Sequence, residues 1–183
     1  MIYLKFAQSE YSDSVSLHKL ARATLYKLLY DAFGEKFVDS DIVIAAGGKP
    51  YIKAAAFDFS YAHTKNAVVT AAVGNGKNKE GLICIDINAQ KIGVDIEPAD
   101  RELKNKDIII EKLFSEKEKE YVRTNKNRRF LEVWTKKESI LKATGEGLSG
   151  FSKTDTYSFN GKYIDTKYVN IGDKEYIVSL AAI

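Results

Sequence analysis

Apolar residues recur along the chain with two different periods, and each period predicts its own kind of element. From Ser14 to Phe33 they follow helical spacing and stop at Gly34, a residue type that commonly closes a helix. The segment 105–144 is also predicted to be helical, in two or three pieces. Apolar or alternating runs predict strands at 2–7, 42–45, 67–73, 81–87, 91–97, 154–159, 162–171 and 175–182. Helices mixed with strands in this way indicate a fold of the α+β class.

The final strand repeats the residue pattern of an earlier one. Residues 177–182 echo residues 68–73, since both are apolar runs with one hydroxyl residue inside. This echo predicts two similar halves, at approximately 1–90 and 91–183. Because no linker rich in Pro, Gly or Ser separates them, residues 1–183 are predicted to form a single compact unit.

Local signals predict how some of these elements begin and join. Residues 88–89 separate two strand-like runs and predict a tight turn between them. Ser115 and Thr135 are each followed three residues later by a glutamate, Glu118 or Glu138, and this spacing is typical of a capping box at a helix start. A capping glutamate needs no ligand, so this interpretation competes with a chemical role for either glutamate.

Composition narrows the classes of function. A net charge of +3 argues against bulk nucleic-acid binding. Cys84 is the single cysteine, which excludes an intramolecular disulfide and a cysteine-based metal site, and its apolar neighbours indicate a core position. We find no signal-peptide pattern and no run long enough to span a bilayer, so we expect a cytoplasmic protein with no membrane partner.

Charge is distributed unevenly along the chain. Residues 101–129 carry ten Lys or Arg against six Asp or Glu. Such an excess suits an anionic ligand or an acidic partner protein. A solvated helical face would produce the same pattern, so both interpretations stay open.

Two acids in the segment 91–97 offer the first candidate chemistry. Asp95 and Glu97 are two residues apart on a predicted strand, so both side chains leave one face while the apolar residues between and before them leave the other. Crowded carboxylates repel each other unless a cation joins them, and Mg²⁺ favours such oxygen ligands. Alternatively, the two acids only cover a solvent-exposed strand face.

A second candidate lies in the predicted helix around residue 138. Glu138 and Lys142 are one turn apart, and Trp134 lies a turn earlier on nearly the same face. An aromatic, an acid and a lysine in one stripe are an uncommon way to build a core. A helix start also favours anions nearby, so capping and catalysis are compatible.

Other signals carry less chemistry. Two histidines are too few for a histidine-based metal cluster, and His63 is either structural or a donor to a phosphate. The glycines at 145, 147 and 150 have the spacing of a dinucleotide fingerprint but follow a helix rather than a strand, so they are interpreted as a helix stop and loop. P-loop and Gly-x-Ser-x-Gly hydrolase motifs do not occur.

The central motifs form a set with a specific order and spacing. They are Gly93-Val94-Asp95-Ile96-Glu97, Phe114-Ser115-x-x-Glu118, and Trp134-Thr135-Lys136-Lys137-Glu138-Ser139-x-x-Lys142 with Gly145-x-Gly147-Leu148. Two further matches lie upstream, Gly48-Lys49-Pro50 and Phe59-x-x-Ala62-His63-Thr64. Together these motifs, over about residues 48–148, resemble the 4′-phosphopantetheinyl transferases, in particular the larger type typified by the surfactin-synthetase-activating enzyme.

The resemblance implies a reaction and a fold. In this reaction the phosphopantetheine arm of coenzyme A moves to a serine of an acyl or peptidyl carrier protein, as in fatty acid, polyketide or nonribosomal peptide biosynthesis, and 3′,5′-ADP leaves. The implied fold is a pseudo-twofold α+β arrangement of two similar halves. Both halves of the site then come from one chain, so a monomer is sufficient.

The resemblance also implies roles for individual residues. Asp95, Glu97 and Glu138 would hold Mg²⁺ against the pyrophosphate of coenzyme A. Glu118 would accept the proton of the carrier serine, and Lys142 would contact the reacting phosphate and help 3′,5′-ADP depart. The residues expected to hold coenzyme A are Lys49, His63, Arg22 and Lys137.

The sequence departs from the family pattern around the histidine. The usual asparagine and flanking serines are here Ser60, Ala62 and Thr64, and the chain is shorter than typical members of the larger type. These departures affect hydrogen bonds to the coenzyme and carrier specificity, because the predicted metal and base positions are intact.

Two other functions compete with the transferase. One is a non-catalytic module that binds coenzyme A or a carrier protein, which would have little need for all five central charged residues. The other is a Mg²⁺-dependent phosphodiesterase, which would hydrolyse a nucleotide with water as the acceptor and need no carrier protein.

Overall fold

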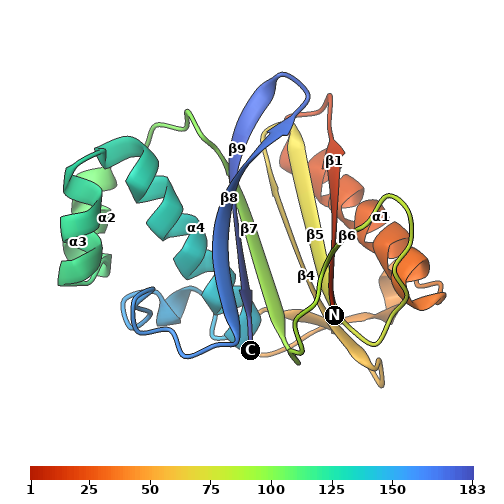
Figure 1. Cartoon of the computed structure of the whole chain (residues 1–183). Coiled ribbons are helices and arrows are strands. Elements are labelled where there is room, and N and C mark those ends of the chain that lie inside the picture. The colour runs from red at the N-terminus through yellow and green to blue at the C-terminus, as the bar shows by residue number, and fades with distance from the viewer.

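The structure is a computed structural model that describes residues 1–183, except for the side chain of Leu148. Leu148 is the last residue of the motif Gly145-x-Gly147-Leu148. Its mixture of helices and strands confirms the α+β prediction (Figure 1). In chain order the elements are β1 (Ile2–Gln8), α1 (Ser14–Phe33), η1 (Asp39–Asp41), β2 (Ile42–Ile44), β3 (Pro50–Ile52), β4 (Phe57–Thr64), β5 (Ala67–Gly74), β6 (Ile83–Ile85), β7 (Ile92–Pro98), α2 (Lys106–Leu113), α3 (Glu116–Arg123), α4 (Lys126–Thr144), η2 (Leu148–Gly150), β8 (Tyr163–Ile171) and β9 (Lys174–Ala182).

The first sheet has the strand order β4-β5-β1-β6, and α1 packs against it. Helix α1 begins where the Asp13 side chain accepts a hydrogen bond from the backbone N–H of Ser16 at 2.9 Å. It ends at Gly34, whose φ of 79° lies in the left-handed region that glycine adopts without strain. The predicted helix at 14–33 is therefore confirmed at both ends.

The second sheet has the order β7-β9-β8, with α4 packed against it. In each sheet one interior strand lies between two antiparallel partners: β5 between β1 and β4, and β9 between β7 and β8. The echoing segments 68–73 and 177–182 fall on these two central strands. Figure 1 shows the strands of both sheets between α1 on one outer side and α4 on the other.

Strands β4 and β7 face each other along a seam between the two sheets. Side chains of β4 replace a strand ladder there: Asp58 Oδ2 and Ser60 Oγ accept the backbone N–H groups of Ile92 and Val94 at 2.8 and 3.1 Å. Apolar side chains from both sheets form one continuous core beneath the seam, including Ile2, Leu4, Val69, Ala71, Val94, Ile96, Val178 and Leu180. The seam therefore joins the two sheets through one core, with hydrogen bonds at its rim.

Helical predictions in the middle of the chain are confirmed. The segment 105–144 contains three helices, α2, α3 and α4. Ser115 caps α3, and its box is complete because Glu118 Oε2 accepts the N–H of Ser115 at 2.8 Å. Thr135, in contrast, lies inside α4, where its hydroxyl donates to the carbonyl oxygen of Leu131 at 2.9 Å. The predicted capping box at Thr135 is therefore wrong, and Glu138 is not a cap.

Two strand predictions are also wrong. Residues 81–87 and 91–97 do not form a hairpin, because β6 pairs with β1 in the first sheet and β7 pairs with β9 in the second. The residues between them cross from one sheet to the other. Residues 154–159 form turns rather than a strand, and two of their backbone groups bond to the side chains of Glu118 and Lys137 instead of a neighbouring strand.

The Cys84 thiol is half-buried, packs against the core beside α1, and donates to Asn78 Oδ1 at 3.3 Å. Within the described residues, every helix is either too short or too polar to cross a membrane.

Candidate active site

Helix α4 crosses strand β7 at Gly93, and the crossing is too close for any side chain. A Cβ atom at Gly93 would lie 1.9 Å from the carbonyl oxygen of Ser139 and 2.5 Å from the backbone nitrogen of Ala143. Real carbon atoms do not approach other atoms so closely, so only glycine fits. The contact brings the acidic face of β7 directly against the helix that carries Glu138 and Lys142.

The two acids of β7 are buried rather than solvated. Asp95 and Glu97 are each 7% exposed, so the alternative of a wet strand face is wrong. Lys142 Nζ lies 2.6 Å from Asp95 Oδ1, while Asp95 Oδ2 is buried and has no hydrogen-bond partner among the described side chains and backbone. Glu97 pairs with Arg101 and accepts from the Thr64 hydroxyl at 3.4 Å.

The carboxylates on β7 and α4 act on one another electrostatically. Burial raises the pKa of Glu138, and the charge of Asp95 raises it further, against the opposing effect of Lys142. Burial likewise raises the pKa of Glu97, where Asp95 adds to the effect and Arg101 opposes it. The cluster thus carries more negative charge than Lys142 and Arg101 neutralise.

A cavity of about 390 Å³ opens beside this cluster, at the end of the seam. Its lining comes from the turn before β3, from β4, from the last turns of α4 and from the glycines that follow α4. The lining residues are Gly47, Gly48, Lys49, Pro50, Phe59, Ser60, Tyr61, Glu138, Leu141, Lys142, Gly145 and Gly147. Residues from both ends of the motif set therefore surround one space.

Glycines from the turn between β2 and β3 and from the segment after α4 make one wall of this cavity. A Cβ at Gly47 would lie 1.8 Å from the carbonyl oxygen of Gly145, and one at Gly147 would lie 3.0 Å from the carbonyl oxygen of Gly47. Main chain therefore packs directly on main chain. The Gly145–Gly147 pattern is a helix stop and close crossing, as its context after a helix predicts, and α4 ends at Gly145 with φ of 78°.

Lys49 lies at the junction of cavity and seam. It pairs with Asp58 and donates to the carbonyl oxygens of Ile92 and Ala143 at 3.1 and 3.4 Å. Burial lowers the pKa of Lys49, although Asp58 opposes that effect. The structure thus places this predicted coenzyme residue in the cavity wall, where it also joins the two sheets.

His63 and Arg22 lie on the side of the cavity that faces α1. The rings of His63 and His18 are 6.1 Å apart, and the ring of His18 is 5.7 Å from that of Tyr61, a cavity residue. Burial lowers the pKa of His63, and the charges of His18 and Lys142 lower it further. Arg22 pairs with Asp39 at 3.1 Å and lines a neighbouring cavity of about 580 Å³.

Glu118 and Lys137 do not face the cavity. They form a fully buried ion pair between α3 and α4, with Glu118 Oε2 at 3.0 Å from Lys137 Nζ. Lys137 also donates to the carbonyl oxygen of Thr154 and lies over the rings of Phe114 and Phe151. The structure thus separates these two predicted site residues from the other seven.

The residues fit a divalent cation, although they do not form a closed ligand set as they stand. Among the described side chains, no three His, Cys, Asp or Glu lie close enough together to hold a metal ion. Lys142 and Arg101 hold two of the carboxylates in this arrangement. The unpartnered Oδ2 of Asp95, and the repulsion from Asp95 that adds to burial in raising the pKa values of Glu97 and Glu138, nevertheless favour a cation such as Mg²⁺ at this position.

Several contributors to this site are absent from the sequence-based prediction. Asp58 and Ser60 hold β7 against β4, and Tyr61 and Leu141 line the cavity. The alternation of Asp58 and Ser60 with apolar Phe57 and Phe59 is the signal that would have placed both on one strand face. No strand was predicted at residues 57–64, and the next predicted strand began at residue 67.

Comparison with known families now adds to this geometry. The family described as the 4′-phosphopantetheinyl transferase superfamily has a model that matches residues 91–180. The match begins at the start of β7 and covers β7, all of α4 and most of β9. No curated protein matches the chain.

Proposed function

Residues 91–180 are a domain of the 4′-phosphopantetheinyl transferase superfamily, and from this premise we propose that the protein moves the phosphopantetheine arm of coenzyme A to a carrier-protein serine. Membership of the superfamily implies phosphopantetheinyl transfer in general. The observation that carries the specific proposal is the cluster of Asp95, Glu97, Glu138 and Lys142 beside the cavity. It offers carboxylates and a lysine where β7 and α4 cross.

The proposed step breaks a phosphoanhydride bond of coenzyme A and forms a phosphate ester on the serine. The serine Oγ forms a bond to the phosphorus next to the pantetheine, the bond from that phosphorus to the bridging oxygen breaks, and 3′,5′-ADP leaves with the electron pair. The serine proton passes to a carboxylate. Phosphoryl transfer depends mostly on positioning and on neutralising charge, which suits a site built from charged side chains.

Asp95, Glu97 and Glu138 are the proposed holders of Mg²⁺. When bound, the ion supplies positive charge that offsets the charge of the pyrophosphate. Lys142, which is 2.6 Å from Asp95 and partly exposed to the cavity, is positioned to leave that carboxylate and contact the reacting phosphate. It then stabilises the oxygen on which 3′,5′-ADP departs.

The proton acceptor requires a revised assignment. The sequence favours Glu118, but both of its oxygens are already bonded inside the fold. Glu138 lines the cavity, and none of the described groups forms a hydrogen bond or ion pair with it. We therefore favour Glu138 as the carboxylate nearest to an incoming serine, in addition to its part in holding the metal.

Coenzyme A is proposed to lie along the cavity towards α1. Lys49 and Tyr61 line the cavity, and His63, His18 and Arg22 continue from Tyr61 to the neighbouring cavity. The cations Lys49 and Arg22 and the hydrogen-bond donors between them suit the phosphates of the coenzyme. Arg22 would exchange its partner Asp39 for a phosphate.

The two sheets support a duplicated architecture. Each half contains a strand, then a long helix, then an antiparallel pair of strands whose second member, β5 or β9, pairs with the first strand, β1 or β7. The first half adds β2, β3 and β6, and the second adds α2 and α3. We propose that halves 1–90 and 91–183 are related by a pseudo-twofold axis and act as one unit. Both contribute to the cavity, so a monomer contains the full site. Sedimentation that shows an obligate dimer would contradict this proposal.

The test is transfer to a carrier protein, measured by intact mass. The protein is incubated with coenzyme A, Mg²⁺ and a panel of apo acyl and peptidyl carrier proteins. A mass gain of one phosphopantetheine, abolished by a chelator and by Asp95→Ala, supports the proposal. Coenzyme A binding without any gain favours a non-catalytic binder. Hydrolysis of coenzyme A without a carrier favours a phosphodiesterase.

A further inference from the structure

Glu118 and Lys137 are fully enclosed by the fold. Their side chains are 0% and 1% exposed, and the carboxylate and ammonium groups lie 3.0 Å apart. A buried ion pair loses the hydration of both charges, and apolar residues of similar size often serve stability as well or better. Stability alone therefore gives little physical reason for this pair.

Each polar atom of the pair fixes a different segment of the chain. Glu118 Oε2 accepts the N–H of Ser115 at 2.8 Å, at the start of α3. Glu118 Oε1 accepts the N–H of Thr156 at 2.8 Å, and Lys137 donates to the carbonyl oxygen of Thr154. Helix α3, helix α4 and the loop after η2 therefore meet at these two side chains.

Lys137 directly precedes Glu138 in α4. Successive side chains of an α-helix are about 100° apart around the axis, so one helix turn presents Lys137 to the interior and Glu138 to the cavity. An anchored Lys137 therefore limits rotation of α4 about its own axis. The close crossing at Gly93 limits translation of the same turn, because the Ser139 carbonyl already touches β7.

We propose that the Glu118–Lys137 pair is a positioning device for the active site. It sets the rotation of α4 and so keeps Glu138 and Lys142 turned towards Asp95. Glu118 then acts through Lys137 and takes no proton from the carrier serine. This inference rests on the proposed transferase function, because it assigns a task within that site.

Three variants separate positioning from chemistry: Glu118→Gln, Lys137→Met and the double variant. Methionine keeps the length of the lysine stem, and its sulfur suits the rings of Phe114 and Phe151, which Lys137 Nζ approaches at 5.6 Å. Each single variant leaves one buried charge without its partner. The double variant leaves none, so it restores an electrically neutral interior.

The rate of transfer per folded molecule is the first measurement. We expect each single variant to lower kcat by about 100-fold, the order of loss that follows from small misplacement of reacting groups, with little change in KM for coenzyme A. The double variant should recover about tenfold or more of that loss, because residues in direct contact are not additive. A double variant as slow as Glu118→Gln overturns the proposal and makes Glu118 the proton acceptor.

Fluorescence of Trp134 is the second measurement and does not depend on turnover. Trp134 is the single tryptophan and packs against Phe151, with ring centroids 4.7 Å apart and the rings tilted by 39°, one helix turn from the ion pair. The single variants should shift its emission and the double variant should restore it. Wild-type emission and rate in Glu118→Gln would overturn the proposal.

The two proposals fail in different ways. If the wild-type protein transfers nothing from coenzyme A to any carrier, the transferase proposal fails. Emission from Trp134 still tests whether the pair orients α4: restoration in the double variant supports that orientation, and unrestored emission overturns the positioning proposal.

Discussion

Lys137 and Lys142 lie five residues apart on the same helix in opposite surroundings. Lys137 is 1% exposed, and its partner Glu118 has both oxygens hydrogen-bonded. Lys142 is 31% exposed, and its partner Asp95 keeps one buried oxygen without any partner in the described structure. Glu118 and Lys137 are completely paired, as expected of residues that hold the fold together. Asp95 is incompletely paired, as expected of a site prepared for a ligand.

The largest effect on the rate of transfer should come from a substitution of Asp95, the incompletely paired carboxylate. We expect Asp95→Asn to lower the rate of transfer by about 1,000-fold, the order found when one preorganised electrostatic group is removed from an active site. Stability should stay the same or rise, because the substitution removes repulsion with Glu97 and Glu138. Mass spectrometry of the carrier and thermal unfolding of the variant measure the two quantities.

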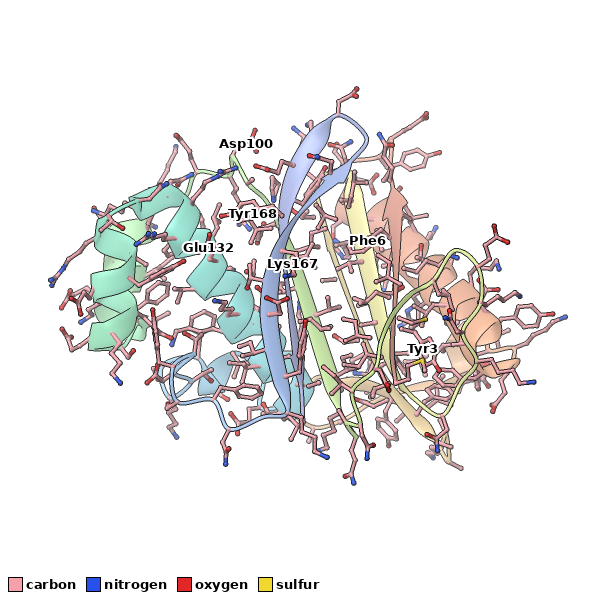
Figure 2. All side chains as sticks on the ribbon, in the orientation of Figure 1. Tyr3, Phe6, Asp100, Glu132, Lys167 and Tyr168 are labelled. Atoms are coloured by element: carbon pink, nitrogen blue, oxygen red, sulfur yellow. The ribbon has the colours of Figure 1, made fainter. Side chains whose placement is uncertain are left out.

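Asp100→Asn is the matched control for this experiment. Asp100 is exposed just beyond the end of β7 (Figure 2), so the substitution should leave both rate and melting temperature unchanged. A large loss of stability in Asp95→Asn, with the rate retained per folded molecule, would instead assign Asp95 to the architecture.

The next effect concerns the two lysines themselves. Lys137→Ala leaves the buried carboxylate of Glu118 without its partner, and we expect it to lower the free energy of unfolding by about 3–5 kcal/mol. Lys142→Ala removes a partly exposed partner and should cost about 1 kcal/mol or less. Urea unfolding of both variants in the presence of a chelator compares them directly. Equal losses would contradict the distinction between the two surroundings.

A smaller effect is expected from pH at Glu138. Its pKa is raised above the ordinary 4.5 by burial and then by Asp95, so the folded state binds the proton more readily than the unfolded state. This group therefore destabilises the fold as pH rises above that value. Glu138→Gln should be more stable than wild type at pH 7 in a chelator, and the advantage should shrink as pH falls through the raised pKa and be lost below 4.5. Urea unfolding at several pH values measures this difference.

Asp31 is a carboxylate whose ionised form stabilises the fold, in contrast to that of Glu138. Burial opposes its ionisation, but hydrogen bonds from Lys27, Lys79 and Lys5 outweigh that effect and lower its pKa to about 2. Its contribution to stability is present above the ordinary 3.8 and is lost as pH falls through about 2. Asp31→Asn should therefore destabilise at pH 7, where Glu138→Gln stabilises. The same sign for both would contradict the charge balance inferred here.

The smallest effect should follow a change at Tyr168. Its hydroxyl donates to Glu132 across the space between β8 and α4, where Figure 2 labels both residues. Because Tyr168 is 40% exposed, we expect Tyr168→Phe to cost about 1 kcal/mol or less and to leave transfer unchanged. Chemical unfolding and the carrier assay test this, and a clear loss of transfer would extend the site to the far side of α4.

Periodicity predicts the long elements of this fold well. The helix at 14–33 and the strands at 67–73 and 175–182 carry strong apolar patterns, and their positions agree with the structure. Which strands pair was harder to predict from the sequence. Residues 81–87 and 91–97 follow each other closely in the chain, yet they belong to different sheets. Which strands pair depends on the core that both sheets share, and this core joins residues far apart in the sequence. A local pattern of residues does not contain that information.

The site residues could likewise be predicted only in part. Asp95 and Glu97 could be placed on one strand face from spacing alone, and the motif order places Glu138 and Lys142 beside them, as the structure does. Motif matching also assigned Glu118 as the proton acceptor and Lys137 as a contact of coenzyme A, but the fold directs both side chains inward. Neighbours in a helix point in different directions, so which of two charged residues reaches a cavity depends on how the helix is rotated against its sheet.

The contact of Gly47 with Gly145 bears on how this protein can diversify. That wall of the cavity is main chain against main chain, so mutation can close it but can hardly reshape it. Heritable variation in the size or polarity of the cavity is therefore confined to positions such as Phe59, Tyr61 and Leu141. A directed-evolution library aimed at bulkier coenzyme A derivatives belongs at those three positions, with both glycines held constant.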